Sequence, residues 1–190
     1  MTTESGSGRH VYILMYGDPA KRDSWLYRNV LRHMSAVQLD YDVTEEPSGR
    51  VLLKINVAGR IPSVTLADDN PIARLAVISD PFAEALTEYR LHDAAGEVIG
   101  NLKEKPPKSI LCVSPDVALA LRGTDYYLVC PHALGASRTR YRMLEGNREV
   151  GVIVPFNHFP EIHLDDERCL LASALLFLAI VKHDSSKSHT

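Results

Sequence analysis

The segment DDERCLLASALLFLAIVK, residues 165–182, has the pattern that decides the fold. Its leading acidic residues offer an N-cap and negative charge at the start of a helix, and Lys182 lies at the other end. Between them, Cys169 to Val181 is apolar except for Ser173, so every face of the helix is apolar. Thirteen such residues rise about 20 Å, short of the roughly 30 Å hydrocarbon core of a bilayer. The sequence therefore predicts a helix over 166–182 that is enclosed by protein.

Most of the chain before this helix has the pattern of short antiparallel strands. Residues 89–100 and 141–153 each have the pattern of a hairpin, with Gly96 and Gly146 able to supply the positive φ of the turn. A looser third copy covers 39–52. Further runs of strand length lie at 51–57, 74–78 and 126–130. Many strands followed by one enclosed helix indicate a mostly β (α+β) fold, a closed antiparallel β-barrel wrapped around the C-terminal helix.

Other elements are fewer. Asp18-Pro19 is a helix start, and helical spacing of apolar residues predicts a helix over 18–34. A second, short helix is expected from Ser114-Pro115 to Gly123. Residues 1–9 and 184–190 are small and polar and are expected to be disordered tails, which leaves a single domain over 10–183.

Composition restricts the class of protein. The chain has 190 residues, is 45% hydrophobic and has a net charge of −3, which excludes a generally basic nucleic-acid binder. Its three cysteines form no C-x-x-C pair and lie among apolar neighbours, as buried thiols do. The N-terminal residues lack the basic start and apolar run of a signal peptide. We therefore expect a cytoplasmic setting.

Three features resemble one known family. They are the hairpin Tyr-x-Leu-x-Asp-x-x-Gly-x-x-Ile-Gly at 89–100, its echo at 141–153, and the acidic start of an apolar C-terminal helix. Together they resemble the tubby-like superfamily, in its phospholipid scramblase and LURP-one-related branch. The resemblance implies a closed barrel of about twelve antiparallel strands around the C-terminal helix. It also implies a function that is mostly non-catalytic, with phosphoinositides bound by basic residues of the barrel surface and association with membranes.

The candidate binding site is basic. Arg138, Arg140 and Arg142 share one face if their segment is extended, and guanidiniums bind phosphate in a bidentate manner. Lys103 and Lys105, together with Lys108, border Pro106-Pro107 and would enlarge the same patch. The alternative is a solvated strand face whose charges discourage edge pairing.

A second candidate uses metal ligands. His158, Glu161 and His163 follow the spacing H-x-x-E-x-H, which differs from the zincin H-E-x-x-H, and Pro160 opposes a helix there. In an extended segment Glu161 and His163 share a face, and His158 points the other way. A loop ahead of a capped helix also explains the acidic residues. The alternative function is thus a small metal-dependent hydrolase or metal-binding protein.

Motifs for other chemistry are missing from the sequence. There is no G-x-S-x-G elbow, P-loop or G-x-G-x-x-G, so we predict no catalytic residue and no cofactor. The expected partner is an anionic phospholipid or, alternatively, another protein, and we expect no nucleic acid. Membrane association is expected to be peripheral rather than integral. The sequence does not specify the oligomeric state.

Overall fold

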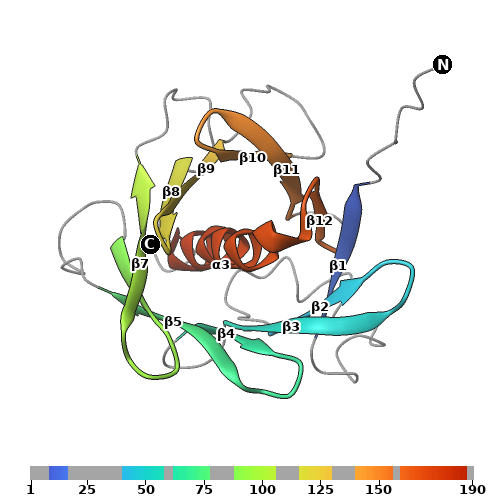
Figure 1. Cartoon of the computed structure of the whole chain (residues 1–190), viewed down its shortest axis with the longest axis horizontal. Helices are drawn as coiled ribbons and strands as arrows, with labels where there is room; N and C mark the ends of the chain where they lie inside the picture. Colours follow the sequence, from blue (N-terminus) through green and yellow to red (C-terminus); the bar gives the residue numbers. More distant parts are fainter. Residues whose placement is uncertain are drawn as a thin grey trace.

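The computed structural model describes residues 9–16, 40–57, 62–77, 88–105, 116–129, 140–155 and 159–187. In these ranges twelve antiparallel strands form one closed barrel around a C-terminal helix (Figure 1). The strands are β1 (His10–Tyr16), β2 (Tyr41–Glu45), β3 (Arg50–Asn56), β4 (Ser63–Leu66), β5 (Pro71–Val77), β6 (Glu88–His92), β7 (Val98–Lys105), β8 (Asp116–Leu121), β9 (Thr124–Val129), β10 (Tyr141–Glu145), β11 (Arg148–Val154) and β12 (Glu161–Leu164). A short 3-10 turn, η2 (Glu167–Cys169), leads into the helix α3 (Leu170–Lys187).

Each strand pairs with its neighbours in chain order, and β1 pairs with β12 to close the ring. The closing register places His10 opposite Leu164 and Ile13 opposite Glu161. Register shifts that indicate β-bulges occur in four of the ladders, including β2–β3 and β10–β11. A bulge bends its strand, which helps a sheet to curve into a closed barrel.

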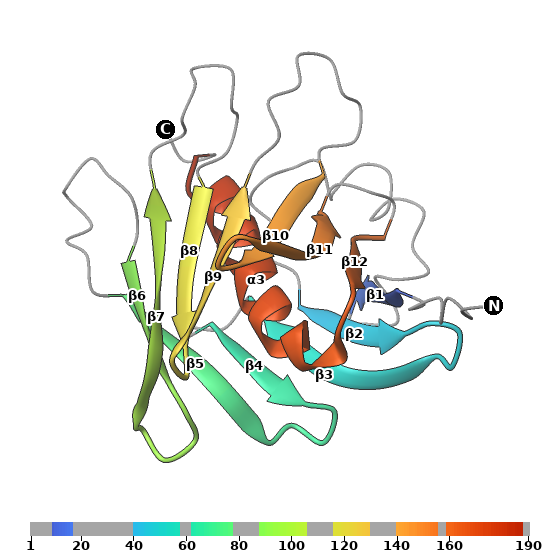
Figure 2. The same cartoon turned by 45° about the horizontal axis from the view of Figure 1, so that its top comes forward.

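The core lies between the helix and the inward faces of the strands. Residues 172–180 of α3 are all buried, as the apolar pattern on every face of this helix requires. Phe177 packs edge-on against Tyr41 of β2, with ring centroids 5.1 Å apart. Figure 2 shows α3 surrounded by strands from both halves of the chain.

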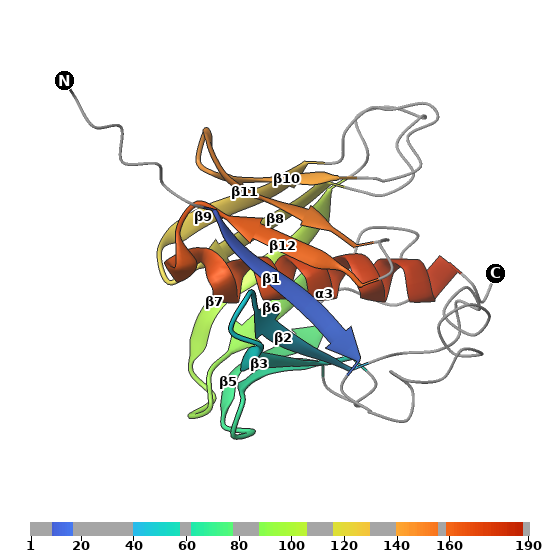
Figure 3. The same ribbon diagram turned by 90° about the vertical axis from the view of Figure 1, so that its right-hand side faces the viewer.

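The two ends of the barrel differ. At one end, which we call the turn end, tight turns at 46–49, 93–97 and 146–147 join successive strands, and α3 begins. At the opposite end, which we call the far end, the strands are joined through residues outside the described ranges. Figure 3 shows α3 running from the turn end toward the far end.

The structure confirms the predicted fold class, a closed antiparallel barrel around a buried C-terminal helix. The hairpin glycines have the expected positive φ, +88° at Gly96 and +58° at Gly146. Asp166 caps the 3-10 turn, because its carboxylate accepts a hydrogen bond from the backbone N–H of Arg168. In the described residues no helix is long and apolar enough to cross a membrane.

Three expectations about elements need correction, and a fourth falls outside the described residues. The short helix predicted to end at Gly123 is wrong, since residues 116–121 form the strand β8. The loop predicted ahead of the last helix contains the strand β12. The helix itself extends to Lys187, beyond its predicted end at 182 and into the predicted tail 184–190. The helix predicted over 18–34 lies outside the described residues.

Candidate functional site: cations on the barrel surface

The predicted basic residues that the structure describes lie on the outer face of the barrel. Tyr141 points into the core, whereas Arg140 and Arg142 on either side of it are exposed, as the period of a strand requires. Lys103 and Lys105 are likewise exposed on β7, with the buried Glu104 between them. Arg138 lies outside the described residues.

Two of these cations have carboxylate partners. Arg142 donates a hydrogen bond from Nε to Oε2 of Glu149 on β11, at 2.7 Å. Lys103 Nζ lies 3.2 Å from Oε2 of Glu88 on β6. Arg142 and Lys103 have side chains that are 57% and 56% exposed, so both pairs are solvated and contribute little to stability. Each pair does reduce the net charge that its cation offers to a ligand.

The other two cations form no ion pair with a carboxylate of the described residues, although Asp116 lies opposite Lys105 in the β7–β8 ladder. Lys105 Nζ lies over the ring of Tyr127, 5.1 Å from its centroid, in a cation–π contact. Arg140 has no ion pair or hydrogen bond with its side chain in the part of the chain that the structure describes. Lys105 is the last residue of β7 and Arg140 immediately precedes β10, so both lie at the far end. The far end therefore presents two exposed cations without a described ion pair, alongside the carboxylates of Asp40, Glu88, Asp116 and Glu161 at the same end.

Lys105 and Arg140 do not converge on one point. Strands β7 and β10 are separated by β8 and β9, which places their ends about 14 Å apart at the usual spacing between strands. We expected the lysines and arginines to form a single patch. The structure instead places Lys105 and Arg140 at two separate positions on one end of the barrel.

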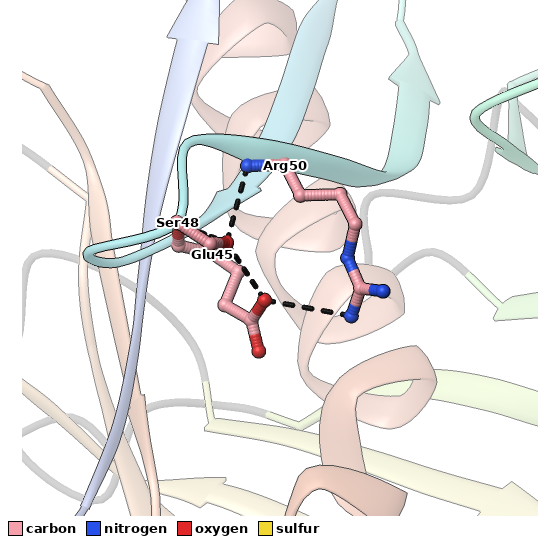
Figure 4. A network of polar contacts seen from close by, with 3 residues as sticks. All are labelled: Glu45, Ser48 and Arg50. Carbon is pink, nitrogen blue, oxygen red and sulfur yellow. Dashed lines mark hydrogen bonds and ion pairs between the residues drawn. The ribbon is translucent and has the colours of Figure 1, made fainter.

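At the turn end, by contrast, most arginines are neutralised. Four ion pairs join arginine and carboxylate there: Arg9–Asp165 at 3.0 Å, Arg50–Glu45 at 3.4 Å, Arg148–Glu145 at 2.8 Å and Arg168–Asp166 at 2.6 Å. Glu45 also accepts a hydrogen bond from Ser48 Oγ (Figure 4). The same Ser48 oxygen accepts a hydrogen bond from the backbone N–H of Arg50. Arg122, in the turn between β8 and β9, is the turn-end arginine without such a pair in the described ranges.

Two exposed arginines were missed by the sequence analysis. Arg74 on β5 and Arg90 on β6 are on the outer face and have no carboxylate partner within the described residues. Each is an isolated basic residue in its strand, so no local cluster marks it. The alternation of apolar and polar residues could have identified them as outward-facing, since each arginine lies between two buried neighbours in its strand.

The predicted metal ligands are brought together only in part. His163 Nε2 lies 2.9 Å from Oε2 of Glu161, and both side chains project from the outer face of β12. His158 lies outside the described residues. Across the described ranges, no three His, Cys, Asp or Glu side chains form a group that could hold a metal ion. Glu161 and His163 thus share a face, as expected for an extended segment.

One buried polar contact lies at the start of α3. Burial raises the pKa of the Cys169 thiol, and the nearby carboxylates of Glu145 and Asp166 raise it further. Burial also raises the pKa of Tyr126, whose side chain is hydrogen-bonded to that of Cys169. Both groups are therefore held in their neutral forms, and the thiol is a weak nucleophile. This contact is structural rather than catalytic.

Comparison with known proteins gives no relative: no protein family, curated protein or solved structure matches this chain.

Proposed function

We propose that the protein is a non-catalytic module that binds anionic phospholipids, phosphoinositides included, with the far end of the barrel facing the membrane. The observation that carries this proposal is that Lys105 and Arg140, both exposed at one end of the barrel, form no ion pair with a described carboxylate. Arg142 lies beside them, and its pair with Glu149 uses Nε.

The separation of these cations favours a surface of several lipids over a single head group. Positions about 14 Å apart on β7 and β10 contact different head groups of one leaflet. Each Lys or Arg held near an anionic bilayer contributes about 1 kcal/mol, and salt weakens the attraction. Lys108 and Arg138, the other basic residues of the predicted patch, lie outside the described residues.

The test is flotation of the full chain with neutral vesicles and with vesicles that contain phosphoinositide, at low and at moderate salt. We expect binding that requires the anionic lipid and weakens as salt is added. The variant Lys105→Glu/Arg140→Glu should lower the bound fraction about tenfold or more.

The matched control is Arg74→Glu/Arg90→Glu, which changes the net charge by the same amount on another face. It should bind anionic vesicles nearly as well as the wild type. Equal losses in both variants would show a response to net charge alone and would reject the far end as the site.

A further inference from the structure

Arg74 and Arg90 form a second surface whose charge no described carboxylate balances. The β5–β6 register places Arg74 opposite His92 and Ala76 opposite Arg90, which makes the two arginines diagonal neighbours on the outer face. Diagonal neighbours of a sheet are about 7–8 Å apart, within reach of long side chains. Two guanidiniums thus stand side by side and are available to an anionic partner.

Two polar side chains border the arginines. Asn101 on β7 lies opposite Arg90, and no other described residue hydrogen-bonds its side-chain amide. His92 Nδ1 lies 2.9 Å from the carbonyl oxygen of Gly96. Because a carbonyl only accepts, Nδ1 carries the hydrogen, and Nε2 is the nitrogen left for a ligand. The surface therefore offers both hydrogen-bond donors and acceptors beside its two charges.

A shallow groove of about 130 Å³ continues from Asn101 across β8 to β9. Its floor is made by Ala118 and Ala120 of β8, which are flanked by the longer side chains of Asn101 and Lys103 on β7 and of Asp125 and Tyr127 on β9. Small side chains between long ones leave room for part of a bound molecule. The floor is apolar, and the walls are polar.

The two sides of the groove differ in charge. Asp125 on the β9 wall is exposed, and its carboxylate has no partner among the described side chains. Arg90 lies beyond the opposite wall, next to Asn101. A bound chain must therefore place its negative groups over β5 and β6, and a neutral or basic part over the groove.

We propose that this surface docks an extended acidic segment of a partner protein, with two carboxylates at alternate positions on Arg74 and Arg90. Alternate residues of an extended chain share a face and are about 6.6 Å apart, which matches the separation of the arginines. Each guanidinium then binds its own carboxylate in a bidentate pair. A small apolar residue further along the segment lies on the floor of Ala118 and Ala120, which is two strand spacings, about 10 Å, from β6. Asn101 hydrogen-bonds the backbone of the segment.

The two arginines of this site are separate from the bilayer surface proposed above, although the groove beside them shares Tyr127 with the Lys105 contact. Arg90 on β6 and Arg140 before β10 are four strands apart in a ring of twelve, a third of the way around the barrel. Asn101, opposite Arg90, is also four residues from Lys105, about 13 Å along β7. A flat membrane at the far end therefore leaves Arg74 and Arg90 accessible to a second partner.

The test selects peptides from a randomised display library on the full chain and then titrates the enriched peptide in solution. We expect enrichment of sequences with two acidic residues at alternate positions. Arg74→Gln/Arg90→Gln should weaken the enriched peptide about tenfold or more. The matched variant Arg50→Gln/Arg140→Gln removes the same charge away from the groove and should leave the affinity within about twofold.

A third variant tests the groove itself. Ala120→Leu fills the floor without changing charge, and it should also weaken the peptide. Thermal unfolding of each variant confirms that it is folded. The proposal is overturned if no acidic pattern is enriched, if Arg74→Gln/Arg90→Gln binds the peptide like the wild type, or if Ala120→Leu has no effect. It is also overturned if Arg74 and Arg90 prove to be needed for binding anionic vesicles instead.

Discussion

Tyr12 is a buried residue whose polar atom has no partner. It points inward from β1 and is 0% exposed, and its hydroxyl forms no hydrogen bond within the described structure. Burial raises its pKa, and the carboxylates of Glu167, Glu45 and Asp166 raise it further. The residue therefore contributes a large apolar ring to the core, with a hydroxyl group that is desolvated without compensation.

Replacing this hydroxyl should stabilise the protein. An unsatisfied buried donor costs about 1–3 kcal/mol, so we expect Tyr12→Phe to raise the free energy of unfolding by about 1 kcal/mol. The control is Tyr126→Phe, which removes a hydroxyl that is hydrogen-bonded to Cys169 and should lower the free energy of unfolding. Urea denaturation of the two variants measures both effects. Equal destabilisation by the two substitutions would contradict this description of Tyr12.

The raised pKa of Tyr12 also predicts a pH dependence. A tyrosine in the unfolded chain ionises near pH 10, below the raised pKa of the folded state. The unfolded state therefore loses this proton first, and the contribution of Tyr12 to stability falls as pH rises through that range. We expect the stability advantage of Tyr12→Phe over the wild type to grow above pH 10 in urea denaturation. An advantage that is constant or shrinks would contradict the assignment.

At the scale of the element, Gly100 fixes how closely β7 and β8 approach. A Cβ at this position would collide with the backbone carbonyl of Ala120, on the strand paired with β7. Gly151 on β11 is similar, since a Cβ there would lie 2.5 Å from the carbonyl oxygen of His163. Backbone atoms cannot move aside as the end of a long side chain does, so these two ladders require glycine.

Gly100→Ala should therefore lower the free energy of unfolding by more than about 2 kcal/mol. The control is Gly123→Ala in the turn between β8 and β9, where a Cβ meets open space and only the positive φ of +82° opposes it. That substitution should cost about 1–2 kcal/mol. Thermal or urea unfolding compares them. If Gly100→Ala costs no more than Gly123→Ala, the close approach of β7 and β8 is wrong.

The elements that were predicted have strong local signals. Residues 89–100 and 141–153 combine alternating buried residues with a glycine that the turn requires, and α3 is apolar on every face.

The strand β8 was missed because its outward positions are Ala118 and Ala120, so its sequence lacks the polar alternation of a half-buried strand. The pair Arg122-Gly123, both with positive φ, is the turn signal that could have identified it. β12 was missed because its four residues are too few to show the alternation of a strand clearly.

At the scale of the whole molecule, the candidate site depends on long-range pairing that a sequence does not show. The alternation of Arg140 and Arg142 is local and was predictable. The ion pairs of Arg142 with Glu149 and of Lys103 with Glu88 join different strands, and so does the diagonal of Arg74 and Arg90. The register of the barrel determines which cations remain unbalanced, and that register is set by the complete ring of strands.

We propose that the far end of the whole barrel faces the bilayer. In that orientation the free charges of Lys105 and Arg140 are near the lipid, and the ion-paired arginines of the turn end face away. The helix α3 remains enclosed, because its buried residues pack against the strands on all sides. Membrane binding therefore needs no opening of the barrel.

The most direct test of this central claim is hydrogen–deuterium exchange of the full chain with and without phosphoinositide-containing vesicles. We predict slower exchange on vesicles in peptides that cover 102–116 and 129–142, which include the far ends of β7 to β10. Peptides over the turns at 46–49 and 93–97 should be unchanged. Protection of those turns, or of β5 and β6 without the far end, would contradict the account.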